Sequence, residues 1–426
     1  MKWAERLSKS LFVRAADTIT HGSLELVCPD RTYSFAGLKP GAAAMMVIHD
    51  EGTFRRAFLE GDRGLGESYM DGWWSSPDLV GLLRLALRNG HAFNRLNGVW
   101  SLVARHGSRL THRLRANTPS GSRSNIAAHY DLGNDFFRLF LDRELLYSSA
   151  WFEHDEDSLE AAQIAKMDRL CRKLRLGPDD HLLEIGSGWG ALAIHAATRY
   201  GCRVTTTTIS RRQFEYTRKR VDALGEAGRR ITVLSDDYRD LRGQFTRIVS
   251  VEMFEAVGLE HYDDFFGACE RLITPEGSIL LQIITMNEQD FHSTYGRAED
   301  WMQGNIFPGS ELASLAEVLR SAGRVTQFRP FHLEDLGLHY ARTLGEWRER
   351  FNRERDTILG LGFDEAFMRK WDLYLAFSQA AFAERHISDV QLLFGRGYHD
   401  APMFGETAGR SGSGFPASVV SEGVVQ

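Results

Sequence analysis

The sequence lacks a cysteine pattern that would support disulfide bonds or a metal site. It has only four cysteines in 426 residues, and they form neither a CxxC pair nor a zinc-ligand spacing. We therefore expect free, buried thiols, no bound metal, and a chain that works in a reducing cytoplasm. The four are Cys28, Cys171, Cys202 and Cys269.

The sequence also lacks a long apolar run. Its N-terminal stretch MKWAERLSKSLFVRAADTI is interrupted by charges, unlike a signal peptide. No segment approaches the roughly 18 apolar residues that a membrane-spanning helix needs. Any work on a membrane is therefore expected from its surface, which predicts a cytoplasmic protein, peripheral at the inner membrane surface.

One segment has no acidic residue at all. The whole chain carries 51 Lys and Arg against 57 Asp and Glu, a net charge of −6, which argues against a nucleic-acid partner. Residues 79–130, however, contain neither Asp nor Glu. Two interpretations stand: solvated arginines on an amphipathic helix, or contact with anionic lipid headgroups at about 1 kcal/mol per basic residue. The arginines are Arg84, Arg88, Arg95, Arg105, Arg109, Arg113, Arg115 and Arg123.

The pattern of elements changes near residue 120. Before it, alternation predicts a small antiparallel element over 23–35 and a helix over 77–88 that begins after a Ser cap. A stretch rich in Ser, Gly and Pro over 116–124 predicts a linker. After it, strands alternate with helices, which favours a largely parallel sheet covered by helices. The expected strands are 181–185, 203–209, 231–234, 245–251, 278–285 and 390–394, the last closing the sheet.

We therefore predict an α/β protein with three parts. Residues 1–120 form a smaller α+β domain, residues 121–400 form the main α/β domain, and residues 401–426, rich in Gly, Ser and Ala, form a disordered tail.

A glycine-rich turn, LLEIGSGWG at 182–190, joins a predicted strand to a helix. Its spacing is GxGxG, without the third glycine of the dinucleotide fingerprint. Glu184 lies inside the strand, where a carboxylate would accept hydrogen bonds from an ammonium or hydroxyl group and repel a pyrophosphate. The pattern therefore favours S-adenosylmethionine over a nicotinamide cofactor.

A collinear set of motifs resembles the cyclopropane-fatty-acyl-phospholipid synthases and mycolic-acid methyltransferases. The resemblance implies a Rossmann-like class I methyltransferase domain, S-adenosylmethionine as cofactor, and the cis double bond of an unsaturated phospholipid acyl chain as substrate. The motifs are GLGESYMDGWW (64–74), HYDLGNDFFRLFLD (129–142), YSSAWF (147–152), LLEIGSGWG, TISRRQ (208–213), DYRDL (237–241), IVSVEMFEAVG (248–258), IFPG (306–309) and HYARTLGEW (339–347).

The resemblance implies which residues bind the cofactor. Ser210 is also a plausible helix N-cap and Tyr238 a plausible core residue, so both keep a structural alternative. The implied residues are Tyr147 and Ser148 over the methionine part, Glu184, Gly186 and Gly188 at its carboxylate and amino end, Thr208, Ile209, Ser210 and Gln213 near the ribose, and Asp237 and Tyr238 near the adenine.

Methyl transfer to an alkene leaves a carbocation, which must be shielded from water and lose a proton to a base. In ring-forming relatives the resemblance implies a bicarbonate base, held by Cys, Glu, His and Tyr side chains and a backbone amide. Here Cys has become Ser, His has become Gln, and a late-helix Cys has become Ser378, so bicarbonate and ring formation lose support, and a methylene- or methyl-branched acyl chain gains it as the alternative product. The five matching positions are Ser149, Glu255, Gln282, Tyr340 and Ile284.

Glu252 stands three residues before Glu255, directly after a predicted strand. A second carboxylate in a dry pocket would raise the pKa of one of the pair and repel bicarbonate. We hypothesise that Glu252 replaces bicarbonate as proton acceptor or as the charge that stabilises the cation. The alternative is a surface or helix-capping acid.

Two further functions stay open at this point. A nicotinamide oxidoreductase would use the same glycine turn, and a lipid-binding protein with a degenerate site would explain the lost Cys and His. The expected partners are membrane phospholipids, with a homodimer as an open alternative.

Overall fold

The computed structural model describes residues 2–97, 132–294 and 301–396. The predicted linker at 116–124 and the predicted tail at 401–426 lie outside these ranges. All four cysteines lie inside them, and each is buried and unpaired as expected. Within the described ranges, no helix combines the length and the apolar character needed to cross a bilayer.

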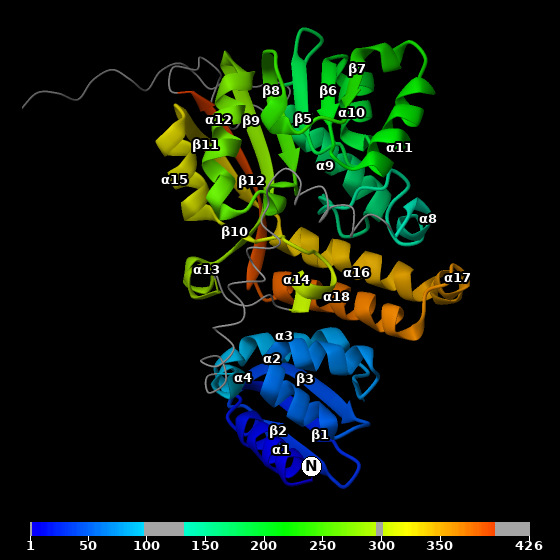
Figure 1. Ribbon diagram of the computed structural model, residues 1–426, viewed down its shortest axis with the longest axis vertical. Coiled ribbons are helices and arrows are strands. Elements are labelled where there is room, and N and C mark those ends of the chain that lie inside the picture. The colour runs from blue at the N-terminus through cyan, green and yellow to red at the C-terminus, as the bar shows by residue number, and fades with distance from the viewer. Residues whose placement is uncertain (1, 98–131, 295–300, 397–426) are drawn as a thin grey trace, which may run out of the picture.

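The N-terminal unit is a four-stranded sheet with helices around it, at the bottom of Figure 1. β1 pairs antiparallel with β2, as predicted, and parallel with β3. The cap of α3 differs from the prediction, because the Asp78 side chain, not a Ser, accepts the Gly81 N–H (2.9 Å). The elements are α1 (Lys2–Ala16), β1 (His21–Val27), β2 (Thr32–Ala36), β3 (Lys39–Ile48), α2 (Gly52–Met70), β4 (Trp74–Ser75), α3 (Leu79–Arg88) and α4 (Gly90–Asn97).

The main sheet has the order β11-β12-β9-β8-β5-β6-β7, and β10 pairs with β9. The strands from β9 to β7 are parallel, which confirms the predicted α/β class. One prediction was wrong: β12 does not close the sheet, because it runs antiparallel between β9 and the unpredicted β11. The strands are β5 (His181–Ile185), β6 (Arg203–Thr207), β7 (Ile231–Leu234), β8 (Phe245–Val251), β9 (Ile273–Met286), β10 (Ala313–Ser314), β11 (Phe328–Asp335) and β12 (Ile387–Arg396).

Helices cover this sheet, with apolar clusters beneath them. The α-helices are α8 (Asn134–Phe137), α9 (Leu159–Lys173), α10 (Ala191–His195), α11 (Arg211–Asp222), α12 (Tyr262–Leu272), α13 (Glu288–Thr294), α14 (Trp301–Asn305), α15 (Leu315–Val325), α16 (Gly337–Arg353), α17 (Arg355–Gly360) and α18 (Glu365–Ala383). Single turns are η1 (Ala196–Tyr200), η2 (Ala227–Arg230), η3 (Tyr238–Asp240), η4 (Phe254–Ala256) and η5 (Leu259–His261).

α16 and α18 form a layer between the main sheet and the N-terminal unit (Figure 1). The Tyr69 hydroxyl donates to Asp372 on α18 (3.1 Å). Arg84 and Arg88 of α3 both form ion pairs with Glu384, the C-cap residue of α18. The two units therefore share polar contacts as well as one aromatic-rich core.

Candidate active site

Most of the residues expected to bind the cofactor lie at or just after the carboxyl ends of β5, β6 and β7, while Tyr147 and Ser148 precede β5 in the chain. Since these strands are parallel neighbours, their ends meet at one edge of the sheet. Glu252 and Glu255 follow β8, which pairs with β5 at the point where the strand order reverses. Open α/β sheets bind their ligands at such a point.

The glycine turn after β5 is tied to the neighbouring strand. The Gly186 and Ser187 N–H groups both donate to the Thr207 carbonyl (3.0 Å each). Gly186 has a φ of 99°, and an added Cβ would lie 3.2 Å from the Cβ of Met253, so this position requires glycine. Gly188 faces open space. Met253 stands between Glu252 and Glu255 in the chain, so the segment that carries the two glutamates passes close to this turn.

Glu184 is buried at the end of β5 and accepts a hydrogen bond from Thr206 (2.5 Å). Burial raises its pKa to about 8. A cation placed beside this carboxyl group would lower the pKa and restore the negative charge. The side chain therefore fits an ammonium ligand better than an anionic one.

In the segments after β6 and β7, polar side chains form hydrogen bonds within their own segment. Ser210 caps α11 by accepting the Gln213 N–H (3.4 Å), and the Thr208 hydroxyl donates to the Gln213 side chain (2.9 Å). Asp237 accepts two bonds from the Arg239 guanidinium (2.8 and 2.7 Å), and Tyr238 packs edge-on against Phe265. The structural alternatives for Ser210 and Tyr238 are thus present. Ile209 is partly buried in the same loop as Thr208 and Ser210. Cofactor binding by the six expected residues of these two segments stays a prediction.

Residues 147–150 cross the site and are held mainly by α9 and α18. The Tyr147 hydroxyl meets that of Tyr374 (2.8 Å). The Ser148 carbonyl accepts from Gln163 (2.9 Å), and its hydroxyl accepts from the buried ammonium of Lys166 (2.5 Å). Burial lowers the pKa of Lys166, and the nearby acids, Glu252 first among them, oppose that shift.

The Glu252 carboxylate collects three hydrogen bonds. The Ser149 N–H and the Gln282 side-chain amide donate to Oε1 (2.8 Å each), and the Tyr340 hydroxyl donates to Oε2 (2.7 Å). Glu252 has a φ of 47°, in the left-handed region, which is energetically unfavourable for a residue other than glycine. Burial raises its pKa, while Tyr340 and Lys166 pull the pKa back down.

Glu255 has a different environment. The Ile284 N–H donates to its Oε1 (2.5 Å), while its Oε2 is buried and has no hydrogen bond within the described ranges. Burial, followed by the charge of Glu252, raises its pKa to about 8. The two carboxyl groups are thereby set apart: Glu255, with a pKa of about 8, is mainly protonated at neutral pH, whereas Glu252, which accepts three hydrogen bonds, is the better placed of the two to carry a negative charge.

The donors expected around bicarbonate therefore bind the two glutamates. One detail differs from expectation: Ser149 contributes its backbone N–H, because its hydroxyl donates to the Ala150 carbonyl (3.1 Å). Ser378 lies half-buried on α18, and no hydrogen bond found among the described residues joins it to this carboxylate cluster.

Two members of the cluster were missed in the sequence, Lys166 and Asp389. Asp389 is fully buried, accepts from the Gln282 amide (2.9 Å), and has a pKa raised well above its usual value by burial. A lone acid in the apolar segment ISDVQLLF was the available signal. For Lys166 the signal was its position three residues after Gln163, on the buried face of an amphipathic helix.

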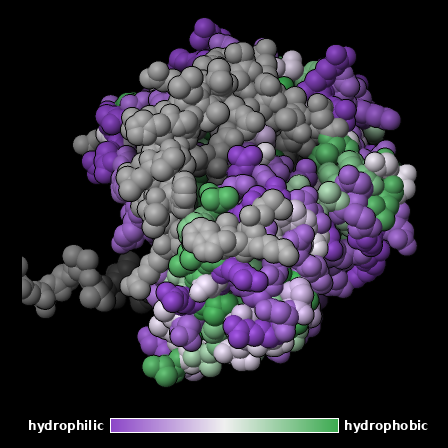
Figure 2. Space-filling view, turned by 60° about the horizontal axis from the view of Figure 1, so that its bottom comes forward, coloured by the Kyte–Doolittle hydropathy of each residue, from purple (hydrophilic) through white to green (hydrophobic). Residues whose placement is uncertain are grey.

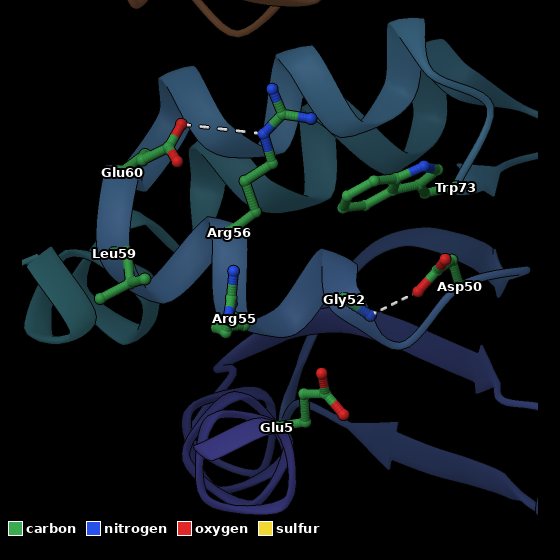
Figure 3. A pocket seen from close by; sticks show the side chains of 8 residues that line it. All are labelled: Glu5, Asp50, Gly52, Arg55, Arg56, Leu59, Glu60 and Trp73. Atoms are coloured by element: carbon green, nitrogen blue, oxygen red, sulfur yellow. Dashed lines mark hydrogen bonds and ion pairs between the residues drawn. The ribbon is translucent and has the colours of Figure 1, made fainter. Parts of the chain in front are cut away.

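A surface cavity lies apart from this cluster, among the described residues of the N-terminal unit. Its volume is about 420 Å³, and it opens between α1, α2 and the loop before α2 in the N-terminal unit (Figure 3). Its charges are mixed, and Arg56 faces Glu60 across it (3.7 Å). None of the groups described above lines it, so it is separate from the carboxylate cluster. The lining residues are Glu5, Asp50, Gly52, Arg55, Arg56, Leu59, Glu60 and Trp73.

Comparison with known proteins agrees with this geometry. The family described as mycolic acid cyclopropane synthetase matches residues 118–392. The tuberculostearic acid methyltransferase UfaA1 of Mycobacterium tuberculosis is 39% identical over 88% of both chains. The cyclopropane-fatty-acyl-phospholipid synthase of Escherichia coli is 37% identical over 84% of this chain and 89% of its own.

The crystal structure of mycolic acid cyclopropane synthase CmaA1 with SAH and CTAB superposes with a TM-score of 0.59. It is 33% identical and covers 64% of this chain and 97% of its own. These matches decide against a nicotinamide oxidoreductase. The chain belongs to the mycolic acid cyclopropane synthetase family and is an S-adenosylmethionine-dependent methyltransferase.

Proposed function

We propose that this enzyme transfers the methyl group of S-adenosylmethionine to the cis double bond of an unsaturated phospholipid acyl chain, as a cyclopropane-fatty-acyl-phospholipid synthase does. The observation that carries the proposal is the Glu252 carboxylate, held by three donors beside the glycine turn. It gives a site for a positively charged cofactor a fixed negative charge and a base.

The proposed reaction has two stages, methyl transfer and then loss of a proton. The π electrons of the alkene attack the sulfonium methyl, the C–S bond breaks, and S-adenosylhomocysteine leaves. The new C–C bond places a carbocation on the other alkene carbon, next to the Glu252 carboxylate. Loss of a proton from the new methyl group to that carboxylate closes the three-membered ring. One proton is released for each methyl transferred.

A methylene-branched chain is the second candidate product. It arises when a 1,2-hydride shift moves the cation to the methyl-bearing carbon before the methyl group loses its proton. One observation favours it: a similar relative is named a tuberculostearic acid methyltransferase.

Glu252 also makes bicarbonate unnecessary. The Tyr340, Gln282 and Ser149 donors that would hold the anion are already engaged, and a second anion there would be repelled. We expect activity to be independent of added bicarbonate.

A membrane surface as the place of reaction is part of the proposal. The N-terminal unit exposes the apolar side chains of Leu7, Leu38 and Leu59, and Figure 2 shows apolar patches among hydrophilic surface on the face that brings this end forward. Arg84 and Arg88, however, pair with Glu384. The side chain of Arg95 lies outside the described residues. So do the other arginines of the acid-free segment, namely Arg105, Arg109, Arg113, Arg115 and Arg123. A homodimer remains a prediction that analytical ultracentrifugation would check.

Expression in a host whose lipids contain oleate tests the function. A mass gain of one CH2 in phospholipids, measured by mass spectrometry, is expected. High-field cyclopropyl protons would identify the ring, and vinylidene protons the branch. Lipid binding without a mass gain would contradict the proposal and favour a degenerate site.

Glu252→Gln tests the base. It should bind S-adenosylhomocysteine normally and lose product formation by about 10²- to 10⁴-fold. Glu255→Gln is the matched control, because Gln resembles the protonated carboxyl group that we assign to Glu255. Near-normal turnover by Glu252→Gln, or a wild-type rate that rises with bicarbonate, would overturn the role of Glu252.

A further inference from the structure

A line of hydrogen-bonded side chains runs from Glu252 through the interior to the opposite side of β12. The Gln282 amide on β9 donates to Glu252 and, in turn, its oxygen accepts from the amide of Gln391 on β12 (3.0 Å). The Gln391 oxygen accepts from the ammonium of Lys173 on α9. Both glutamines are fully buried, and Lys173 is nearly so.

Lys173 determines how the side-chain amides of Gln391 and Gln282 are oriented. An ammonium group has three donors and no acceptor, whereas an amide can present either its oxygen or its NH2 group. Facing Lys173, Gln391 must present its oxygen, so its NH2 group points to Gln282. Gln282 must then receive that bond on its own oxygen, which leaves its NH2 group for Glu252 and Asp389.

We propose that Lys173 is a positioning residue that fixes the amide orientation of Gln282 and thereby secures a hydrogen bond to Glu252. This inference rests on the proposed role of Glu252 as base. Without the ammonium group, both amides could rotate, and the Gln282 oxygen would then face two carboxyl groups.

Lys173 is not required for the ion pair on its outer side. Its ammonium also donates to Glu334 of β11 (2.5 Å), but Arg169, one turn earlier on α9, makes two bonds to the same carboxylate (2.6 and 2.7 Å). Glu334 therefore keeps a cation if Lys173 is replaced. Arg169 does not touch Gln391, which makes it the natural control.

Charged and titratable groups lie at both ends of this line of hydrogen bonds. Around Lys173 lie Arg169, Glu334 and His332, and burial lowers the pKa of Lys173 to about 8. Around Glu252 lie Tyr340 of α16, Lys166 of α9, Asp389 of β12 and Glu255 of η4. The line through the two glutamines joins these two groups of charges.

The test is the pH profile of kcat for Lys173→Met. Loss of the oriented Gln282 bond disfavours the ionised form of Glu252, so the acidic limb should move up by about one pH unit. Lys173→Arg, which also has only donors, should keep the wild-type profile, and so should Arg169→Met. Gln391→Met breaks the line without removing a charge and should repeat the shift, so the test holds even if Lys173→Met fails to fold.

The outcomes separate the two proposals. If Glu252→Gln is inactive while Lys173→Met and Gln391→Met both show the wild-type pH profile, the positioning role is wrong and the base assignment stands. If Glu252→Gln remains active, the base assignment itself fails. An equal shift in Arg169→Met would assign the effect to the surface ion pair and overturn the inference.

Discussion

The cofactor edge and the carboxylate cluster lie side by side but are built differently. At the cofactor edge, side chains pair with neighbours a few residues away in the chain or on the adjacent strand, as Thr208 does with Gln213 and Glu184 with Thr206. In the cluster, Glu252 takes its donors from residues up to 103 positions away. The cofactor edge is therefore built from short stretches of neighbouring sequence, whereas the cluster depends on how distant segments pack against one another.

The substitution Tyr340→Phe tests this difference between the two regions with the largest expected effect. It removes one donor from Glu252, and a hydrogen bond to a charged group contributes about 1.5–3 kcal/mol, so kcat should fall about 10- to 100-fold. The acidic limb of the pH profile should also move up, since that bond lowers the pKa of Glu252. Tyr200→Phe is the control, because its hydroxyl binds Asp168 away from the site (2.6 Å). Equal losses in both variants would contradict the prediction.

The same contrast explains what could be predicted from sequence. The strands 181–185, 231–234 and 245–251 have the predicted bounds, because each is a short apolar run between clear turns. β11 was missed because most of its residues are exposed or half-buried, as in an edge strand, and because it contains Pro330.

The site was predictable only in part. Glu255 was found because it matches a site residue of the family that the sequence resembles, and Glu252 because it stands directly after a predicted strand, three residues before Glu255. The sequence could not show that Ser149 would contribute its backbone N–H, nor that Lys166 and Asp389 would join, because these contacts depend on how α9 and β12 pack against the sheet.

Glu184→Gln sharpens the comparison from the cofactor side. If Glu184 binds the amino end of the cofactor, the variant should bind S-adenosylhomocysteine about tenfold more weakly. The pKa of about 8 also requires the carboxyl group to lose a proton on binding a cation at pH 7. Calorimetry in two buffers of different ionisation enthalpy should detect this proton release in the wild type and less of it in the variant. Unchanged affinity for S-adenosylhomocysteine would show that Glu184 does not bind the cofactor.

Glu255→Gln gives an effect on stability. The pKa of Glu255 is about 8 in the folded protein against 4.5 for an unperturbed Glu. The unfolded chain therefore loses its proton first, and this residue lowers the free energy of unfolding progressively as pH rises from about 5 to 8. The variant should be close in stability to the wild type near pH 5 and more stable at pH 8, on the order of a few kcal/mol. Urea unfolding at both pH values checks this, and parallel curves would contradict it.

The smallest expected effect concerns the contact between the two units. The side chain of Glu384 is only 6% exposed, and hydrogen bonds from Arg88 and Arg84 outweigh burial and lower its pKa. Glu384→Gln leaves the two arginines, which are 43% and 44% exposed, without their acidic partner at a cost of at most about 1 kcal/mol. If α3 also faces anionic headgroups, the freed arginines should strengthen binding to anionic vesicles in a salt-sensitive way. Arg84→Glu with Arg88→Glu should instead weaken both vesicle binding and stability, because it places three carboxylates together. Unchanged vesicle binding by Glu384→Gln, with only its melting temperature lowered, would assign these arginines to the domain contact and leave the membrane surface to other residues.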